Sequence, residues 1–437
     1  MKTDEGLIRA VGVRGLTAAI INYTIGAGIF VLPAVVAGKV GNAAPLIYVI
    51  CGIAMALIVM CFAEAGSRVP LSGGTYAYAE TAFGPYVGYM IAMLLWLGAN
   101  VLASAAVANV SVDTLGQIFP VFTKPAVRTA FLITMYFFFA YINVRGVKTG
   151  SRAVQTVTVG KLLPILLLVV VGLFAAKGSN LSWPGLPPAG DVSRTAMVLI
   201  FAFMGFESAL TPSGEVKNPV RTVPRSIAIA LISVTILYIL IQVVSQGVLG
   251  GELATNDKAP LAETARRLMG NGGRILVLIG AAISTFGFVG GDILCSPRAV
   301  YALGRDGLLP SIFGRIHERF RTPHVAIITH AALCATLAVT GSFNALVVLS
   351  VLSALIVYLV CCLATIQLQR KNIRVEGSIP YSVPGGRVVP ILASAIVIWL
   401  MSSSTLKEFI ALAIAIAVFT LIYFLMRARR VPVPTAS

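Results

Sequence analysis

Two glycine-containing stretches interrupt long apolar segments at points where a ligand could reach the backbone. The first is Gly26-Ala27-Gly28, and the second runs from Phe203 to Ser208 around Gly205 and Glu207. A helix broken at such a point frees N–H groups that suit a carboxylate and carbonyl groups that suit an ammonium. We therefore predict a site for a small zwitterion, although glycines that only bring helices close together would give the same residue types.

Three ionisable residues, Lys161, Glu207 and Asp292, lie inside apolar segments, where a charge costs roughly 3 kcal/mol. Lys161 is interpreted as a fixed or titrating cation, with snorkelling to the membrane surface as the alternative. Glu207 is assigned either to holding the broken backbone or to proton coupling. Asp292 is assigned to a vestibule on the cytoplasmic side.

Aromatic and small residues complete the predicted lining of the site. Phe201 and Phe206 flank the second interruption and could close over a ligand, although most aromatic residues in membrane helices only pack. Ser284 and Gly287 lie on a later apolar segment, where their small size would leave room for the side chain of a ligand.

The elements that position these residues are predicted to be membrane-spanning helices. Of the 437 residues, 58% are hydrophobic and only 11% are charged, whereas a soluble domain carries about 25% charged residues. The first apolar stretch has no cleavage site and is interpreted as a retained helix. A span needs roughly 20 apolar residues, and twelve stretches are predicted to be spans: 12–37, 43–65, 86–110, 126–143, 154–176, 193–213, 224–249, 274–300, 324–341, 343–368, 388–404 and 407–426.

The predicted fold is an all-α polytopic membrane protein that forms a single domain, 1–437. The interruptions fall in the first and sixth spans, so span order indicates two five-helix repeats, 12–176 and 193–368, followed by two peripheral helices within 388–426. Two longer loops are predicted outside the membrane, from Lys177 to Ser193 and from Gly250 to Gly273. The first is rich in proline, which disfavours a helix there.

Charge is distributed as expected for a membrane protein. The formal net charge is +17, but lysine and arginine lie mainly in short loops on one side of the predicted spans. This bias places both termini in the cytoplasm and the chain in the cytoplasmic membrane. No basic face or recognised nucleic-acid module is present, so nucleic acid is excluded as a partner and the lipid bilayer is the expected surrounding.

Cysteine and histidine do not indicate a metal site or an enzyme. The six cysteines lie in apolar segments without CxxC spacing and are interpreted as small core residues. Of the three histidines, His330 alone lies in an apolar span, where a packing role is favoured over a proton relay. Motifs of metalloproteases, serine hydrolases and P-loop ATPases are absent. We therefore expect no cofactor, no metal and no catalytic residue.

At these residues the sequence resembles the amino acid–polyamine–organocation superfamily. The similarity covers most of the chain. Each motif alone has low specificity, but the order and spacing of the motifs together are specific. They are Ile25 to Phe30 with Leu32-Pro33, Pro70 to Tyr78, Phe201 to Ser208, Glu215 to Pro219, Pro297-Arg298, and Tyr301 to Pro310.

The resemblance implies two inverted repeats with broken first and sixth helices. Substrate binding would then involve the broken segments and their neighbours, and the complete predicted set is Thr24, Ile25, Gly26, Ala27, Gly28, Phe201, Met204, Phe206, Ser284 and Gly287. In the family's arrangement, Ala27 and Gly28 would donate backbone N–H groups to the substrate carboxylate. The carbonyls of Thr24, Phe201 and Met204 would accept from its amine.

The resemblance also implies roles for Phe201, Lys161 and Ala27. Phe201 matches an aromatic gate position. Lys161 matches a lysine of sodium-independent members, whose ammonium lies where sodium-coupled relatives hold an ion, so proton coupling or exchange is expected. Many members have serine where Ala27 stands, a departure that is expected to alter selectivity.

The leading functional hypothesis is secondary active transport of an amino acid by alternating access. Transport would be independent of sodium and either coupled to protons or exchanging. The alternative within transport is a polyamine or cationic amino-acid exchanger, because Glu207 and Asp292 could recognise an amine. A channel or receptor is the alternative outside transport, although a gated single site fits a carrier better.

Overall fold

The computed structural model of the chain is built almost entirely from helices. It describes residues 11–71, 73–146, 151–182, 185, 187–210, 216–256, 258–374 and 379–428, without the side chains of 151–159 and 209. Within these ranges, extended backbone pairs only at an isolated bridge between Val11 and Val216. This fold is expected of apolar segments that must satisfy every backbone polar group internally.

The first half of the chain forms helices α1 to α8. Their bounds are α1 (Val13–Thr24), α2 (Gly28–Val40), α3 (Ala44–Arg68), α4 (Thr75–Phe83), α5 (Pro85–Met93), α6 (Leu102–Ile118), α7 (Pro125–Val144) and α8 (Ser151–Ala175). A π-helical stretch, Leu94–Val101, joins α5 to α6. This stretch lies within the predicted span 86–110, but its π-helical geometry was not predicted, and the short helix α4 lies outside every predicted span.

The second half forms helices α9 to α16. Their bounds are α9 (Ala189–Phe203), α10 (Phe206–Ala209), α11 (Pro219–Leu249), α12 (Pro260–Arg305), α13 (His324–Thr340), α14 (Phe343–Arg370), α15 (Val388–Met401) and α16 (Leu406–Ala428). Every predicted span overlaps one or more helices. The narrow division at Gly341-Ser342 does separate α13 from α14.

The prediction of a loop from Gly250 to Gly273 is wrong over its second half. Helix α12 already begins at Pro260, and Gly270 within it adopts a positive φ of 67° that bends the helix. Proline is well suited to the first helical position because its missing N–H has no partner there anyway. The loop predicted from Lys177 is also shorter than expected, since α9 begins at Ala189.

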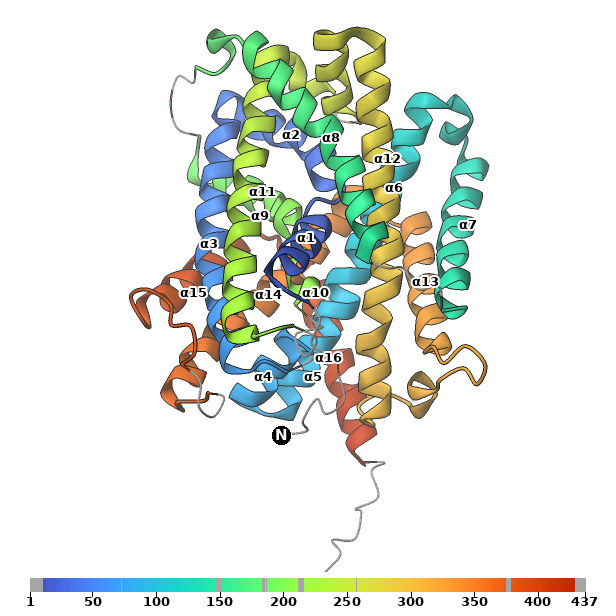
Figure 1. Cartoon of the computed structure of the whole chain (residues 1–437), viewed down its shortest axis with the longest axis vertical. Helices are drawn as coiled ribbons and strands as arrows, with labels where there is room; N and C mark the ends of the chain where they lie inside the picture. Colours follow the sequence, from blue (N-terminus) through green and yellow to red (C-terminus); the bar gives the residue numbers. More distant parts are fainter. Residues whose placement is uncertain are drawn as a thin grey trace, which may run out of the picture.

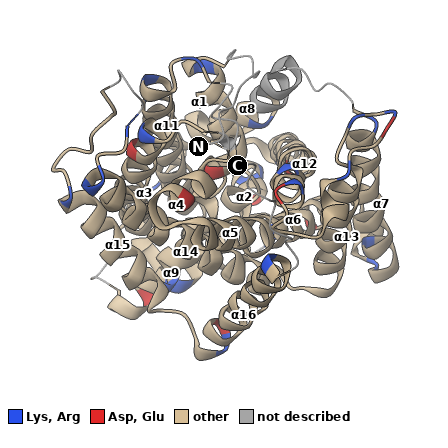
Figure 2. Ribbon diagram, turned by 90° about the horizontal axis from the view of Figure 1, so that it is seen from below, with Lys and Arg blue, Asp and Glu red and all other residues tan. Residues whose placement is uncertain are grey.

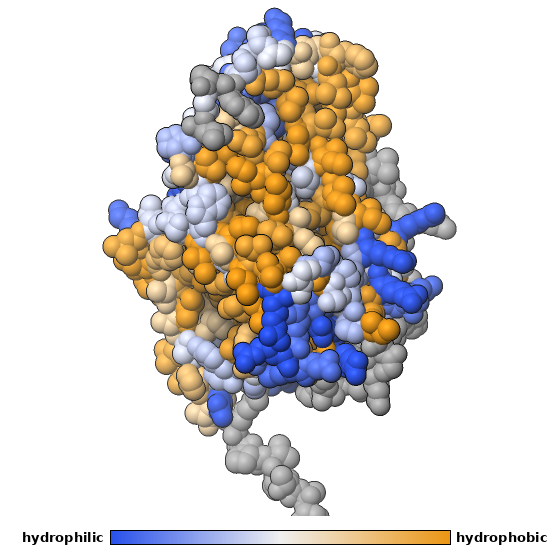
Figure 3. Space-filling view, turned by 90° about the vertical axis from the view of Figure 1, so that its left-hand side faces the viewer, coloured by the Kyte–Doolittle hydropathy of each residue, from blue (hydrophilic) through white to orange (hydrophobic). Residues whose placement is uncertain are grey.

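Among the described residues, eight helical stretches are long and apolar enough to cross a membrane. One of them, Gly28–Arg68, contains both α2 and α3, and three shorter apolar helices include Gly160–Ala175. On the face drawn in Figure 3, hydrophobic atoms cover most of the surface and hydrophilic atoms gather toward its lower part. Most of the described bundle is free of charged residues in Figure 2. The chain is thus a multi-pass membrane protein, and the count of twelve spans stays a prediction.

Helix α1 lies near the centre of the bundle, surrounded by α8, α10, α11 and α12 (Figure 1). Its continuation α2 packs against α9, the first part of the other broken segment. Helices α7 and α13 lie side by side at one edge of the bundle. The broken segments therefore lie inside the protein, where irregular backbone can find partners other than lipid.

Parts of the predicted motifs and loops lie outside the described residues. They are Ser72 in the motif after the second predicted span, Glu215 in the motif before α11, and Trp183 and Pro184 in the proline-rich loop.

Candidate functional site

The first broken segment separates α1 from α2 at Ile25, Gly26 and Ala27. Helix α1 ends at Thr24, and Ile25 has a non-helical ψ of 78°. Helix α2 begins at Gly28. The first N–H groups of a helix have no partner within it, so the start of α2 presents the kind of donors that a carboxylate needs.

Side chains from two other helices hold the carbonyls of this break. The Nζ of Lys161 on α8 donates to the carbonyl oxygens of Asn22, at 2.6 Å, and Ile25, at 2.7 Å. The Oγ of Ser284 on α12 lies 3.1 Å from the carbonyl oxygens of both Ile25 and Gly26. Lys161 is only 1% exposed, so its ammonium does not snorkel to the surface in this structure.

Tyr238 on α11 connects the first break to the second. Its hydroxyl lies 3.1 Å from the carbonyl oxygen of Thr24 and 2.8 Å from that of Ala202. Thr24 and Ala202 lie at or next to the last residues of α1 and α9. One buried hydroxyl thus satisfies freed carbonyls of both broken segments.

The two broken segments cross closely at Gly28. A Cβ atom at this position would lie 3.0 Å from the Cα of Ala202 and 3.3 Å from the ring of Phe201. Such spacing is tighter than a side chain tolerates without movement of the α9 backbone. Gly28 is therefore required by the packing of α2 against α9, as the alternative interpretation of these glycines predicted, and its role in the approach of a ligand stays a prediction.

The second broken segment separates α9 from α10 at Met204 and Gly205. Gly205 has a φ of 108°, and a Cβ there would lie 2.6 Å from the carbonyl oxygen of Tyr23. Both carboxylate oxygens of Glu207 accept from the N–H of Gly205 at 3.1 Å. The hydroxyl of Tyr358 on α14 donates to Glu207 at 3.2 Å. Glu207 therefore has the structural role that the sequence suggested, and a role in proton coupling is not tested.

A pocket lies between the two broken segments. The predicted site residues that line it are Thr24, Gly26, Ala27, Gly28, Phe201, Met204, Glu207 and Asp292. Residues Tyr23, Asn100, Phe288 and Ser208 also contribute. The pocket therefore brings together predicted residues that are far apart in the sequence.

Five predicted site residues lie behind the wall of the pocket. Ile25, Lys161 and Ser284 form the hydrogen bonds that support the first break. The ring of Phe206 packs against Phe62 and Tyr358. Gly287, the fifth, is partly buried on α12. These residues shape the pocket through their neighbours in this structure.

The carbonyl of Thr24 already has two donors. It accepts from the N–H of Gly26 at 2.9 Å and from the hydroxyl of Tyr238 at 3.1 Å. A carbonyl oxygen has two lone pairs, so a substrate amine would have to replace one of these donors. The carbonyl of Phe201 accepts from the N–H of Met204 at 3.4 Å, a long bond that leaves it more available.

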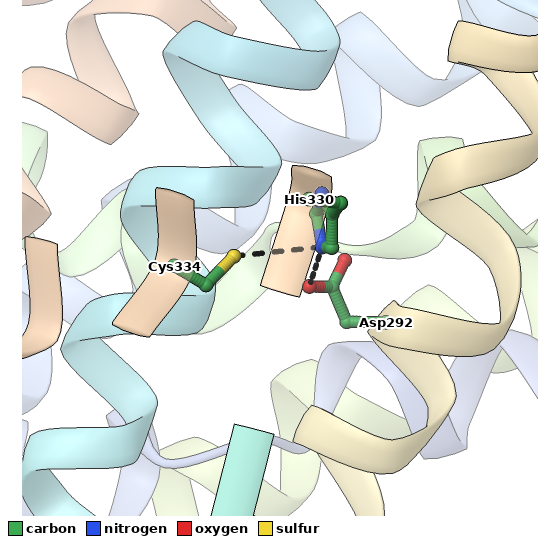
Figure 4. A group of neighbouring side chains, drawn as sticks. All are labelled: Asp292, His330 and Cys334. Carbon is green, nitrogen blue, oxygen red and sulfur yellow. Dashed lines mark hydrogen bonds and ion pairs between the residues drawn. The ribbon is translucent and has the colours of Figure 1, made fainter. Parts of the chain in front are cut away.

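Asp292 lies in the wall of the pocket and is 4% exposed. Its Oδ1 accepts from the hydroxyl of Ser296, and its Oδ2 lies 2.8 Å from Nε2 of His330 on α13 (Figure 4). Asn100 on the π-helical stretch donates to Ser296 at 3.1 Å. Asp292 is thus buried in the pocket wall, and its assignment to a cytoplasmic vestibule stays a prediction.

Among the residues that the structure describes, one group has the composition of a metal site. Asp292, His330 and Cys334 bring their ligand atoms within 4.8 Å of one another. However, the indole N–H of Trp96 donates to Nδ1 of His330 at 3.0 Å. A neutral imidazole that accepts at Nδ1 carries its proton at Nε2, so Nε2 has no lone pair for a metal.

Several important side chains were not predicted. Tyr238, Tyr358 and Trp96 are polar aromatic residues inside apolar helices, and such residues usually find a hydrogen-bond partner when buried. That general rule could have singled them out, but it does not say which partner each one meets. Asn100 was also missed, although an amide in an apolar segment is a comparable signal.

Comparison with known proteins gives a consistent result over the whole length. A family model described as amino acid permease matches residues 11–429. The chain is 30% identical to the methylthioribose transporter of Bacillus subtilis, over 97% of this chain and 94% of that protein. It is 27% identical to the serine/threonine exchanger SteT of Bacillus subtilis, over 95% of each. It is 29% identical to the vacuolar cationic amino acid transporter 2 of Arabidopsis thaliana, over 76% of this chain and 55% of that protein.

Proposed function

Because the chain belongs to the amino acid permease family, we propose that it is a secondary active transporter that moves an amino acid across the cytoplasmic membrane. Transport proceeds by alternating access, without sodium, and is either coupled to protons or exchanging. Both termini lie in the cytoplasm, as the distribution of lysine and arginine favours.

The observation that carries this proposal is the meeting of two broken helices at one pocket. Backbone groups of Gly26, Ala27 and Gly28 line the pocket together with Met204 and Gly205. The start of α2 supplies N–H groups for the substrate carboxylate, and the end of α9 supplies carbonyls for its amine. Broken helices that bind a substrate near the middle of the membrane are typical of secondary transporters.

The packing of the broken segments supports an inverted repeat. Helix α1 packs against α10, and α2 packs against α9, so the first half of each broken segment lies beside the second half of the other. Two units of opposite orientation would produce this arrangement. We therefore assign spans 1–5 and 6–10, in the predicted set of twelve, to the two repeats.

Lys161 supports independence from sodium. Its ammonium is held by the carbonyls of Asn22 and Ile25 at the first break, and carbonyl oxygens are also the ligands that a sodium ion would need. A fixed cation at this place makes a second one unfavourable. Glu207 lies at the second break and is the candidate for proton coupling.

A cationic amino acid or a polyamine is the second candidate substrate. Asp292 favours it, because this carboxylate lies in the wall of the pocket with no lysine or arginine bound to it among the described residues. A buried charge is costly unless it is compensated, and a second positive group on the substrate would compensate it.

Counterflow into proteoliposomes tests the proposal. Vesicles loaded with one unlabelled amino acid would be diluted into the same labelled compound, in sodium buffer and in choline buffer, with serine, leucine, lysine and putrescine as separate probes. We expect saturable accumulation of at least one probe at equal rates in both buffers. Gly28→Leu, which fills the backbone approach to the pocket, should abolish it.

Two results would contradict the proposal. Counterflow that requires sodium would refute the role of Lys161, and unitary currents without saturable counterflow would favour a channel. Full counterflow by Gly28→Leu would place the binding site elsewhere.

A further inference from the structure

Among the described residues, two carboxylates lie in the pocket wall, and Asp292 is the one that has no hydrogen bond to the backbone of either break. The other carboxylate in the wall, Glu207, is occupied by the N–H of Gly205 and the hydroxyl of Tyr358. Asp292 instead lies on α12, and its partners Ser296 and His330 belong to neither broken segment. Its negative charge therefore needs a separate explanation.

The partners of Asp292 keep it ionised. Because Trp96 can only donate, Nδ1 of His330 must accept and Nε2 must carry the proton of the neutral ring. Nε2 then donates to Oδ2 of Asp292, and the hydroxyl of Ser296 donates to Oδ1. Two donors favour a carboxylate, since a protonated acid would need an acceptor in one of these places.

The same hydrogen bonds prevent His330 from neutralising Asp292. A second proton on the imidazole would sit on Nδ1 and face the indole N–H of Trp96, so a cationic ring requires the loss of that bond. Arg298, about one and a half turns further along α12, is exposed. Among the described residues, His330 is the only basic side chain within ion-pair distance of Asp292, and it is neutral in this arrangement. The group formed by Trp96, His330 and Asp292 thus carries one uncompensated negative charge.

The distance from the first break to Asp292 matches the length of a lysine side chain. The ring of Phe288 lies 3.3 Å from the place of a Cβ on Gly26, so Phe288 stands level with the break. Asp292 follows four residues later on the same face of α12, about 6 Å further along the helix axis. A lysine side chain also spans about 6 Å from Cα to Nζ at ordinary bond lengths.

We propose that Asp292, with its charge fixed by His330 and Trp96, is an anionic subsite that binds the side-chain cation of a basic α-amino acid. The α-ammonium and carboxylate occupy the breaks, and the side chain runs past Phe288 toward Asp292. The rings of Tyr23 and Phe288 line this part of the pocket and add favourable cation–π contacts. The inference rests on the proposed transport function and names the substrate class of that same pocket.

Binding of lysine and norleucine to the purified full-length protein tests this inference. Norleucine is lysine without its terminal ammonium, so the ratio of their two Kd values isolates the cation. We expect wild type to bind lysine at least about tenfold more tightly, the gain of one charge-assisted hydrogen bond. In Asp292→Asn the ratio should fall to about one while norleucine binding persists, which also shows that the variant is folded.

Control variants separate charge from packing. Asp113→Asn removes a carboxylate on α6 that pairs with Arg128, and it should leave the ratio unchanged. His330→Gln offers Asp292 an amide N–H and should keep most of the preference for lysine, whereas His330→Leu should lose it. A purely structural role of His330 would change both Kd values equally and leave their ratio intact.

Three outcomes would overturn the inference in distinguishable ways. Binding of norleucine, serine or leucine by wild type without a preference for lysine would refute the subsite and leave the proposed function standing. Binding of none of these compounds would refute the proposed function as well. A rise in Tm with Zn²⁺ that disappears in Cys334→Ser would show that the three side chains bind a metal instead.

Discussion

The two broken segments are stabilised in different ways. The first break, between α1 and α2, depends on side chains from other helices, because Lys161 on α8 and Ser284 on α12 bind its carbonyls. The second break, between α9 and α10, is held largely by its own residues, with further contacts from Tyr238 and Tyr358. Glu207 binds the N–H of Gly205 two residues before it, and Gly205 adopts a left-handed φ of 108° that glycine permits.

This difference indicates how strongly the conformation of each break depends on the positions of neighbouring helices. The shape of the first break is linked to the positions of α8 and α12, so a movement of these helices changes the carbonyls available to a substrate. The second break depends less on α8 and α12, because Glu207 and Gly205 within it set much of its shape. We therefore expect variants at the second break to affect folding most, and variants around the first to affect transport more than folding.

The largest expected effect is that of Gly205→Ala. The new Cβ would lie 2.6 Å from the carbonyl oxygen of Tyr23 at a backbone conformation unfavourable for alanine, which should cost roughly 3 kcal/mol or more. Uptake should disappear, and the Tm in detergent should fall. Gly251→Ala is the matched control because nothing lies near its Cβ position, and equal behaviour of the two variants would mean that the second break is not locally determined.

Lys161→Ala should be next in size and should affect transport more than stability. It leaves the carbonyls of Asn22 and Ile25 without this donor, at about 1–3 kcal/mol for each unsatisfied group. We expect uptake to fall by about 100-fold or more with a protein that still elutes as a folded species. The exposed Lys177→Ala serves as the control. Wild-type uptake by Lys161→Ala would show that α8 does not support the first break.

Glu207→Gln should have an intermediate effect on uptake. It separates the role of Glu207 in holding the broken backbone from its proposed role in proton coupling. Glutamine keeps one oxygen for the N–H of Gly205, so the fold should survive, but it cannot exchange a proton at neutral pH. Proton-driven uptake should fall about tenfold or more, while counterflow at equal pH on both sides should be largely retained. Equal loss of both activities would limit Glu207 to a structural role; Glu318→Gln, at an exposed position, is the control.

Ser284→Ala should give the smallest effect of the series. Both carbonyls lose the hydroxyl of Ser284, but that of Ile25 still accepts from Lys161, so the main loss falls on the carbonyl of Gly26. The expected cost is about 1 kcal/mol, which corresponds to an uptake reduction of about fivefold. A loss as large as that of Lys161→Ala would mean that α12, and not α8, mainly supports the first break.

The sequence predicted the broken segments and much of the pocket because both depend on local signals. Glycines within apolar segments identified the breaks at Gly26 and Gly205, and charges within apolar segments identified Lys161, Glu207 and Asp292. These residues are costly in lipid unless they have partners. Their types therefore indicated that partners exist.

The identities of those partners could not be predicted. Tyr238 meets the carbonyls of Thr24 and Ala202 across more than one helix, and nothing local to Tyr238 specifies such a contact. The π-helical stretch Leu94–Val101, which carries Trp96 and Asn100, also escaped prediction. Gly98 in this stretch weakens a regular α-helix, but its residues do not specify the wider π-helical hydrogen-bond pattern. The helix from Pro260 was missed because charged residues at its start suggested a solvated loop.

The hydroxyl of Tyr238 has one hydrogen but lies near two acceptors. Its contacts with Thr24 and Ala202 therefore form a three-centre arrangement, whose hydrogen can turn fully to either oxygen with little change in bonding energy. If α1 and α9 separate during a transport cycle, the hydroxyl can keep its bond to one of the two helix ends. Water or substrate can then donate to the carbonyl at the other helix end. A tyrosine of this kind would lower the barrier between conformations without favouring any of them.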